Sequence, residues 1–394
     1  MKGGEWVSAS EEIPVSGVRG HAHGIEVVMA GAFPPPVHGM AAVNAAVRDA
    51  LERAGATPLV IDLAAPSLDR ALATRLSRLP RVLRGLGRLA GKRGLRNATL
   101  YMSVSGGLGQ VYELAFILLA RLREMRVFLH HHSFAYFDRP GMLTRTLVRV
   151  AGDDAVHITL STGMCERLQR AYRAGRVMPV SNAVFFVVAD APAVVRRRLA
   201  TIGFLSNISA EKGVFEFLDL MAAAGNAGWP LHAKLAGPFQ DAGTEQAVCE
   251  RLGSLPQVEY VGPQYGAAKN AFYAGIDALI FPSRYVNEAE PVTVHEALSR
   301  GIPVIAYGPG CIPEIVGADC GLVIDPAAPF VPAALAKLEN WLADPAAFAA
   351  ASRAAAAHYA RTYDESKARW RALLAELTGA AAQEPALSVG GGMK

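Results

Sequence analysis

The chain has 394 residues, of which 52% are hydrophobic, and this length exceeds one ordinary core, so two domains of about 150 to 200 residues each are expected. No uncharged apolar stretch of about eighteen residues occurs, so no membrane-spanning helix is predicted. The formal net charge of +4 favours an acidic partner only weakly, and nucleic acid is not expected, since no recognition motif or aromatic-interleaved basic groove is present.

The N-terminal segment 1–23 is polar and lacks the apolar core of a secretion signal, so we expect it to be disordered. The four cysteines are scattered without metal-ligand spacing, and we interpret them as free thiols of a cytoplasmic protein. They are Cys165, Cys249, Cys311 and Cys320.

A strand, a glycine-bearing loop and a helix come next. The apolar run 25–30 predicts the strand, three prolines at 34–36 hold the loop extended, and Gly39 opens a helix that runs to about Ala54. Ligands bind outside the carboxyl ends of parallel strands, so this loop is a candidate ligand loop. A plain tight turn is the alternative.

Residues 70–96 are rich in arginine and leucine. Helical spacing would place much of the leucine on one face with basic groups around it, although Pro80, Gly85 and Gly87 interrupt any single long helix. Such a surface could rest on anionic lipid headgroups. A solvated helix face packed on the domain is the alternative.

Further strands at 58–61, 98–102 and 126–129 alternate with helices at 108–123 and 143–150, which predicts a doubly wound parallel sheet. Three histidines, His130, His131 and His132, follow the last of these strands. Neighbours on a strand point to opposite faces, so consecutive rings do not converge, and we do not expect a metal site.

The first domain is expected to close after a strand at 177–180, and residues 185–199 form the predicted linker. A second domain then opens with an apolar strand, a polar loop, and Lys212 and Gly213 at the start of a helix. A lysine beside the free amides of a helix N-terminus suits a diphosphate. A solvated helix start is the alternative.

Two carboxylates lie around a proline-started helix in the segment 281–310. An apolar strand at 277–281 precedes the loop that carries Glu288, and Pro291 suits the first position of a helix that carries Glu296. The amides near Pro291 to Thr293 and the helix dipole favour a phosphate, and Glu296 could accept hydrogen bonds from ribose hydroxyls. Solvated surface charges are the alternative.

This segment resembles the retaining glycosyltransferases of family four. Glu288 and Glu296 have the family's E-x7-E spacing, and the string EALSRGIPVIAYGPGCIPEIV that starts at Glu296 is similar to the family's usual continuation. The loop at Gly39 and the run Glu211 to Gly213 are similar to two further elements of the family. The resemblance covers about residues 24–377.

The resemblance implies the GT-B fold, an α/β arrangement of two Rossmann-like domains whose parallel sheets face a central cleft. Residues 24–184 would form the acceptor domain and residues 200–358 the donor domain. Residues 359–378 would form a helix that crosses back to the first domain, and residues 379–394 a disordered tail.

The resemblance also implies roles for single residues. At the catalytic centre it places Glu288, His132 and Lys212. Near the acceptor or the donor sugar it places His38 and His130. Asn207 stands where the family usually has an arginine, and Arg284 is a candidate to replace that cation. The predicted donor-binding residues are Gly39, Asn207, Lys212, Gly237, Val261, Tyr265, Arg284, Pro291, Val292, Thr293 and Glu296.

The expected function is transfer of a sugar from a UDP- or GDP-linked donor to a hydroxyl acceptor with retention, without metal or other cofactor. A saccharide or lipid-linked saccharide of a cell-surface polysaccharide is the expected acceptor. The expected location is the cytoplasm, with contact to the inner membrane surface. The alternatives are a non-catalytic nucleotide-sugar-binding protein, a sugar-nucleotide epimerase or sugar-phosphate synthase on the same fold, and a glycosidase that uses Glu288 with Glu290.

Overall fold

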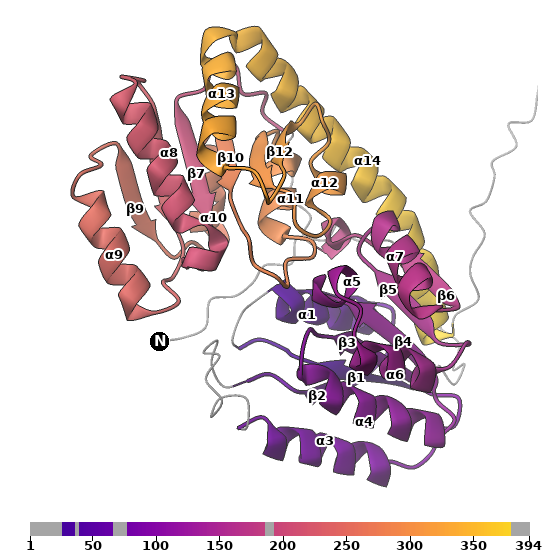
Figure 1. Ribbon diagram of the computed structural model, residues 1–394. Helices are drawn as coiled ribbons and strands as arrows, with labels where there is room; N and C mark the ends of the chain where they lie inside the picture. Colours follow the sequence, from indigo (N-terminus) through magenta and orange to yellow (C-terminus); the bar gives the residue numbers. More distant parts are fainter. Residues whose placement is uncertain (1–25, 36–38, 66–76, 186–192, 380–394) are drawn as a thin grey trace, which may run out of the picture.

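The described residues of the computed structural model, 26–35, 39–65, 77–185 and 193–379, form two α/β domains (Figure 1). Each domain contains a six-stranded sheet in which all neighbouring strands are parallel. The first sheet has the order β2 (Leu59–Asp62), β1 (Val27–Gly31), β3 (Thr99–Val104), β4 (Arg126–His131), β5 (Val156–Thr159), β6 (Arg176–Pro179). The second has the order β12 (Gly321–Ile324), β11 (Val304–Tyr307), β10 (Ala278–Phe281), β7 (Thr201–Leu205), β8 (His232–Ala236), β9 (Val258–Gly262).

The central strands are buried along their whole length, as expected for parallel strands that helices cover on both faces. Every residue of β3, β10 and β11 is buried. This explains why these strands read as continuous apolar runs rather than as alternating patterns. The predicted doubly wound α/β architecture is confirmed.

In the first domain, two groups of helices cover the two faces of the sheet. Helix α1 (Gly39–Arg53) and the C-terminal end of α14 (Pro345–Thr378) pack on one face, where Val47 and Leu373 share a core cluster with Met29. The helices of the other face share a second cluster. They are α3 (Leu79–Gly91), α4 (Gly109–Leu122), α5 (Ala135–Asp138), α6 (Met142–Ala151) and α7 (Thr162–Tyr172).

Helix α3 shows how the glycines predicted to interrupt a helix are accommodated. Pro80 stands in the first turn, where a missing N–H costs nothing. Gly85 packs so closely that an added Cβ would lie 2.5 Å from Cγ2 of Ile61. The helix therefore continues through Gly85 and Gly87, contrary to the prediction. Residues 66–76, which include the first arginines of the predicted basic segment, lie outside the described residues.

The second domain has the same layering. Helices α8 (Val214–Asn226) and α13 (Phe330–Ala343) share a core cluster on one face, and α10 (Gly266–Ala274) and α11 (Val292–Ser299) share one on the other. The remaining short elements are η1, η2, α9 and α12. Their bounds are Asn182–Phe185, Ala210–Lys212, Ala242–Leu252 and Ile312–Ile315. None of the helices in the described part of the chain is long and apolar enough to cross a membrane.

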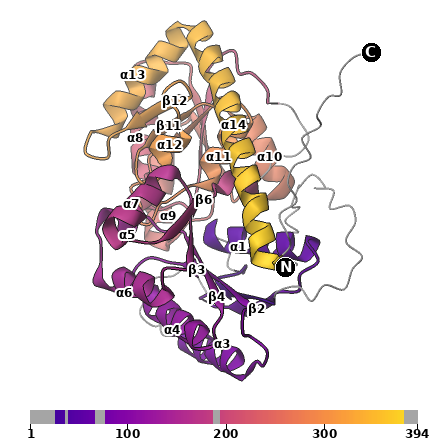
Figure 2. The ribbon, with the colours of Figure 1, turned by 90° about the vertical axis from the view of Figure 1, so that its right-hand side faces the viewer.

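One helix, α14, joins the two domains (Figure 2). Its first turns bury Phe348 in the core of the second domain, and its last turns bury Leu377 in the core of the first. The C-terminal turn is held to the first sheet by Arg176, whose Nη1 lies 2.8 Å from Oε1 of Glu376, and by Thr99, whose hydroxyl donates to the Leu377 carbonyl at 3.2 Å.

A buried carboxylate, Glu290, fixes the junction between the domains. Its Oε1 accepts a hydrogen bond from Ser181 Oγ at 2.7 Å, and its Oε2 accepts one from the Asn182 amide at 2.5 Å. His295 Nε2 lies 3.0 Å from the same Oε1. Because every one of these groups is buried, the partners replace the water that the carboxylate loses. The end of the first domain is thereby tied to the start of α11.

The histidines at the end of β4 alternate between the two faces of the sheet, as predicted. His131 is fully buried, and its two ring nitrogens lie 2.8 Å from Tyr136 Oη and 2.9 Å from Nδ1 of His157. His130 and His132 share the other face, with ring centroids 4.0 Å apart. Among the described residues there is no group of three side chains that could hold a metal ion.

These buried histidines make stability depend on pH. Burial lowers the pKa of His157 to about 4 and the pKa of His131 well below its usual value. The unfolded chain therefore binds more protons than the folded chain below about pH 6.5, and the free energy of unfolding falls as the pH falls toward 4.

We expect His157→Asn to make this acid-induced loss shallower by up to about 3 kcal/mol, because a shift of one pKa unit corresponds to about 1.4 kcal/mol. Urea denaturation of both proteins at a series of pH values between 4 and 7.5 measures the slope, which is independent of any constant loss caused by the smaller side chain. Equal slopes in the two proteins would contradict the role assigned to His157.

Candidate active site

The candidate site lies where the strand order of the second sheet reverses. Strand β7 is flanked by β8 and β10, so the loops after β7 and β10 leave the sheet in different directions. Ligands of open α/β sheets bind at such a point, outside the carboxyl ends of the strands. The loop after β7 carries Lys212, and the loop after β10 carries Glu288.

Lys212 and Glu288 form a largely buried ion pair. The Lys212 Nζ lies 2.5 Å from Oε2 of Glu288, and their side chains are 19% and 10% exposed. Ser283 Oγ donates to the same Oε2 at 2.8 Å. The ammonium also lies 4.6 Å from the ring centroid of Tyr285, within range of a cation–π interaction. The structure therefore brings together two of the three predicted catalytic residues.

A glycine sets the distance between these two loops. Gly213 has a φ of +83°, in the left-handed region, and an added Cβ would overlap the carbonyl oxygen of Pro282 at the end of β10. Only glycine combines this backbone conformation with this contact. Ser209 Oγ also accepts a hydrogen bond from the Lys212 amide at 3.3 Å and caps the short helix η2.

Glu296 forms the second buried pair of the site. Its Oε1 forms an ion pair with Lys269, and its Oε2 accepts a hydrogen bond from Tyr273 Oη at 2.9 Å. Burial, together with the charge of Glu296, holds the pKa of Tyr273 well above its usual value, so the hydroxyl stays protonated as a donor. Lys269 and Tyr273 were not among the residues predicted from the sequence. Their i, i+4 spacing on the helix before β10 was the available signal.

Helix α11 begins one position later than predicted. Pro291 is the N-cap residue, with φ −72° and ψ 121°, and Val292 is the first helical residue. The amides of Val292 and Thr293 are in the first turn, where no acceptor within the helix is available to them. They therefore stay suited to an anion, as the sequence predicted.

The loops after β8 and β9 hold the residues predicted to contact a nucleobase. Gly237 has a φ of +134°, and an added Cβ would overlap the Ser206 carbonyl. The Gly237 carbonyl accepts a hydrogen bond from Tyr260 Oη at 3.0 Å, and Gln264 Nε2 donates to the Val261 carbonyl at 2.5 Å. Tyr265, which is 52% exposed, is the N-cap of α10.

The structure does not group Arg284 with the Lys212–Glu288 pair. Its guanidinium lies 4.5 Å from the ring centroid of Tyr307, donates a hydrogen bond to the hydroxyl of that residue, and lies 3.9 Å from Oε1 of Glu216. Asn207 is half-buried in the loop after β7. Asn207 stands where the family usually has an arginine, and the idea that Arg284 takes over its role stays a prediction. It requires the Arg284 guanidinium to leave Tyr307 and Glu216.

The first domain contributes its own strand-end loops. Ser133, which follows β4, donates a hydrogen bond to Oδ1 of Asn287 at 2.8 Å, so the carboxyl ends of the two sheets meet here. His132 is half-buried directly before Ser133. Gly39 is exposed at the start of α1, and an added Cβ there would meet no atom within 4 Å. His38 lies outside the described residues.

His130 is buried in the first domain and is almost inaccessible to solvent. It is 1% exposed, and its Nδ1 lies 2.6 Å from Tyr101 Oη. Burial is the main cause that lowers its pKa well below the usual value, with His132 and His131 adding to the effect, so the ring is neutral. A structural role accounts for these contacts, whereas His132 stays the histidine closer to the surface.

The glycosidase alternative required Glu290 to act beside Glu288. Both carboxylate oxygens of Glu290 are already bonded, to Ser181 and to the Asn182 amide, and the side chain is buried at the domain junction. It therefore serves as a structural group, and the pair of carboxylates that hydrolysis requires is not formed by Glu288 and Glu290.

Comparison with known proteins identifies the second domain. Residues 194–362 match the family model of glycosyl transferases group 1. No curated protein matches the sequence.

Several solved structures share the fold over most of the chain. Sucrose-phosphate synthase from Thermosynechococcus elongatus has 17% identity and a TM-score of 0.69, over 90% of this chain and 100% of that one. HepE of Anabaena, in complex with UDP, has 15% identity and a TM-score of 0.65, over 90% and 100%. The pneumococcal O-GlcNAc transferase GtfA, in complex with UDP and GlcNAc, has 14% identity and a TM-score of 0.58, over 75% and 60%.

The two parallel sheets, joined at their carboxyl ends and similar throughout to these structures, have the predicted GT-B fold. The domain that carries Lys212, Glu288 and Glu296 matches the family model of glycosyl transferases group 1, and the predicted resemblance is confirmed.

We expect Gly213→Ala to lower the free energy of unfolding by about 1 to 3 kcal/mol, because the new methyl group meets a backbone carbonyl and the left-handed conformation disfavours alanine. Gly39→Ala is the matched control and should change stability by less than about 0.5 kcal/mol, since its site has room. Chemical denaturation of both variants measures the difference. Equal losses would contradict the close contact assigned to Gly213.

Proposed function

We propose that the protein transfers a sugar from a nucleotide diphosphate sugar to a hydroxyl acceptor, with retention at the anomeric carbon. The observation that carries this proposal is the placement of two buried glutamate–lysine pairs at the strand-order reversal of a group 1 glycosyltransferase domain. Retention rests on the resemblance to family four.

Positive charge is needed where the glycosidic bond to the diphosphate breaks. Lys212 and the first-turn amides of Val292 and Thr293 supply it. Donors that already point at the leaving group stabilise its developing charge without reorganisation at the moment of reaction. We propose that these groups bear the diphosphate charge, so that transfer requires no metal ion.

The two glutamates then contact the sugars of the donor. Glu288, adjacent to Lys212, would hydrogen-bond to hydroxyls of the transferred sugar, and Glu296 to the ribose. In the structure each carboxylate is neutralised by its lysine, so a diphosphate meets little negative potential as it enters. His132 and Gly39, from the first domain, would approach the sugar from the opposite side.

We propose UDP as the nucleotide of the donor, in preference to GDP. The solved structures of HepE and GtfA, which share the fold, both contain UDP. Main-chain carbonyls such as that of Val261 suit a base edge, because each has a second lone pair after the Gln264 contact. For the acceptor we propose a saccharide or a lipid-linked saccharide.

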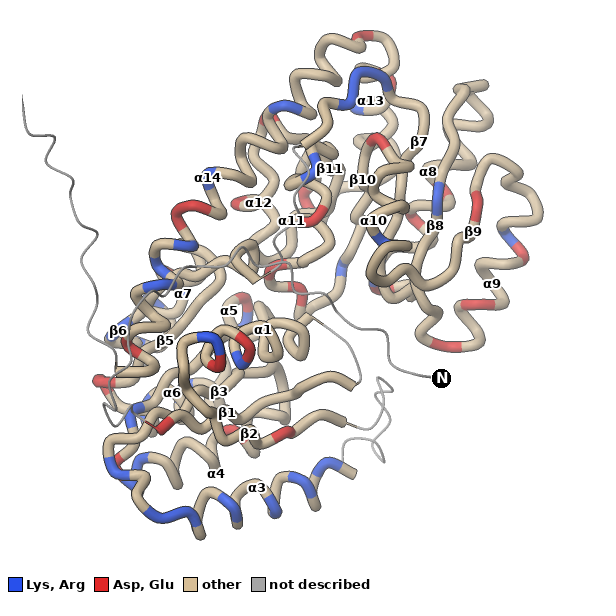
Figure 3. Tube along the Cα trace, turned by 180° about the vertical axis from the view of Figure 1, so that it is seen from behind, with Lys and Arg blue, Asp and Glu red and all other residues tan. Residues whose placement is uncertain are grey.

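A lipid-linked acceptor requires access to a membrane, and the outer face of α3 and α4 is suited to one. Leu83 on α3 and Leu122 on α4 are 60% and 73% exposed, and Leu122 lines a groove of about 430 Å³ together with Leu86 and other apolar residues of the two helices. Basic residues follow the length of α3 (Figure 3). Apolar groups with a basic rim match an anionic lipid surface. We propose contact with the inner face of the membrane here.

Part of this basic segment has a structural role. Arg81 donates to the Ala64 carbonyl at 2.6 Å and Arg88 to the Val60 carbonyl at 3.2 Å, so both cap main-chain groups at the edge of the first sheet. Lys92 pairs with Glu26 at 2.9 Å. The membrane proposal therefore rests on the exposed leucines more than on the count of charges.

A non-catalytic nucleotide-sugar-binding protein is the second candidate. It is favoured by Asn207 in place of the usual arginine and by the contacts of Arg284 with Tyr307 and Glu216, which leave Lys212 as the cation that the loop after β7 supplies for a diphosphate. An epimerase or a sugar-phosphate synthase on this fold would share the same diphosphate clamp. Product analysis with one labelled donor separates these from a transferase.

We expect the wild-type protein to release UDP slowly from at least one sugar in a UDP-sugar panel, and Glu288→Gln to lower that rate on the order of 100-fold, because an interaction made at the reacting centre is lost. Coupled detection of UDP gives the rates. Glu259→Gln, at an exposed position of β9, is the charge-matched control and should keep the wild-type rate.

Thermal shift with UDP completes this test, since a bound ligand raises apparent stability. Stabilisation by UDP without turnover of any donor would favour the binding protein over the transferase. Lys212→Ala should abolish the shift, whereas Arg284→Ala should reduce it far less. An equal loss of the thermal shift in the two variants would show that Arg284 changes its side-chain conformation and contacts the diphosphate.

For the membrane surface, we expect the double variant Leu83→Gln and Leu122→Gln to bind vesicles of equimolar phosphatidylcholine and phosphatidylglycerol on the order of 100-fold more weakly, because each leucine that becomes buried contributes about 1.5 to 3 kcal/mol. Cosedimentation measures the partition. Val194→Gln with Val195→Gln, exposed valines of the segment before β7, is the control. Unchanged binding of the leucine variant would contradict the proposed surface.

A further inference from the structure

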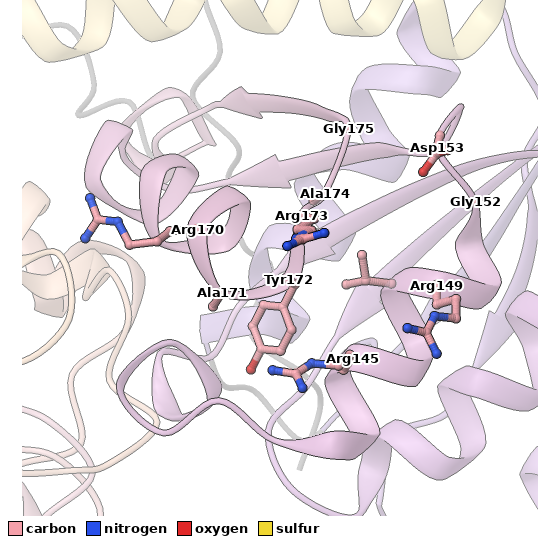
Figure 4. Close-up of a pocket in the computed structure, with 11 residues that line it drawn as sticks. Arg145, Arg149, Gly152, Asp153, Arg170, Ala171, Tyr172, Arg173, Ala174 and Gly175 are labelled. Carbon is pink, nitrogen blue, oxygen red and sulfur yellow. The ribbon is translucent and has the colours of Figure 1, made fainter.

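A pocket of about 470 Å³ lies in the first domain, apart from the residues of the candidate active site. It is formed by α6, α7 and the turn from α7 into β6 (Figure 4). Its lining includes Arg145 and Arg149 from α6, Arg170 from α7, Arg173 from the turn, and one carboxylate, Asp153. The lining is therefore strongly cationic.

None of these four arginines forms an ion pair or a side-chain hydrogen bond with the residues that the structure describes. The neighbouring arginines behave differently. Arg121 pairs with Asp154 at 2.9 Å, and Arg167 pairs with Asp138 at 3.1 Å. Carboxylates are thus available on neighbouring segments, at the end of α5 and between α6 and β5, but they neutralise other arginines.

Figure 4 shows how the guanidinium groups are disposed. Those of Arg145, Arg149 and Arg173 lie around the same opening, beside the ring of Tyr172, whereas Arg170 extends away from it. The Tyr172 hydroxyl donates a hydrogen bond to the Tyr136 carbonyl at 2.5 Å. The ring is therefore fixed as one wall of the pocket, and three cations border it.

Helix electrostatics explain only part of this arrangement, because Arg170 lies in the last turn of α7 and Arg173 is its C-cap residue, where a cation is favourable. Arg149 lies in the last turn of α6, where a cation is favourable, but Arg145 lies near the start of the same helix, where it is not. Arg173 has a φ of +58°, in the left-handed region that glycine or asparagine usually occupies. The charge of Arg145 and the left-handed conformation of Arg173 are both accounted for if these residues bind an anion.

We propose that this pocket binds a phosphate-bearing anion, through Arg145, Arg149 and Arg173. Guanidinium groups match phosphate oxygens with two parallel hydrogen bonds, which makes phosphate the anion class that several converging arginines recognise best. The volume of the pocket exceeds that of a single phosphate, so a diphosphate or a phosphate ester with part of its alcohol fits the site. The inference does not depend on the proposed transferase activity.

The phosphate could belong to a soluble compound or to a lipid headgroup. Helix α6 shares its core cluster with α3 and α4, the helices of the proposed membrane surface. The pocket therefore lies in the same helical layer as that surface, and it could bind either a soluble phosphate compound or a lipid headgroup. The chemistry of recognition is the same for both. Two experimental arms separate the sources: inorganic pyrophosphate in solution, and vesicles of equimolar phosphatidylcholine and phosphatidic acid.

The test uses the full-length protein in a Lys212→Ala background, which removes the lysine proposed to bind the diphosphate of the donor and so weakens the candidate active site as a competing site. Calorimetric titration with pyrophosphate and cosedimentation with the vesicles are each performed with and without the triple variant Arg145→Gln, Arg149→Gln, Arg173→Gln. We expect binding in at least one arm to weaken on the order of 1000-fold, since the variant removes three guanidinium groups and the charge-assisted hydrogen bonds of each contribute on the order of tenfold.

A triple variant on α14, Arg353→Gln, Arg361→Gln, Arg371→Gln, removes the same charge from exposed positions and should bind as the parent does. Arg173→Gly provides a second measurement, because glycine fits the left-handed conformation and preserves the fold while it removes one guanidinium. It should weaken binding on the order of tenfold without lowering the unfolding temperature. Equal binding by the pocket variant and the parent in both arms, or equal losses in the α14 control, would overturn the proposal.

Discussion

The ion pair between Lys212 and Glu288 is the interaction on which the site depends. Two charges that are largely removed from water are stable only if each has a partner, and here the second partners are the hydroxyl of Ser283 and the ring of Tyr285. The pair joins the loops that leave the sheet on either side of its reversal point. It therefore couples the electrostatics of the site to the order of the strands.

Much of this arrangement could be predicted from the sequence, because it is local. Most of the strands are apolar runs, which hydrophobic periodicity locates in the sequence. Glu288 and Glu296 lie close to the start of one helix, which Pro291 and Gly301 mark as its boundary residues. The partners of the two glutamates were harder to predict. Lys269 reaches Glu296 from a different helix, and the contacts of Arg284 depend on Tyr307 at the end of another strand. Such pairings are set by tertiary packing, which no local pattern encodes.

Glu290 illustrates the same limit at the junction of the domains. In the sequence it is one of two acidic residues within a short loop, and only the spacing to Glu296 distinguishes Glu288, two positions earlier, from it. In the structure its carboxylate accepts from Ser181 and from the Asn182 amide, and the neighbouring Ala289 is buried in the core cluster of the first domain. Within one loop, Glu288 thus belongs to the candidate site, whereas Ala289 and Glu290 hold the two domains together.

Helix α14 has a consequence for how the protein is made. Trp370, Leu373 and Leu377, among the last described residues, pack against strands of the first sheet, which is translated long before them. That face of the early lobe stays uncovered while the ribosome completes the chain. The N-terminal half therefore cannot mature as it emerges, and a fragment that ends before these residues would expose apolar surface to nascent-chain chaperones or to self-association.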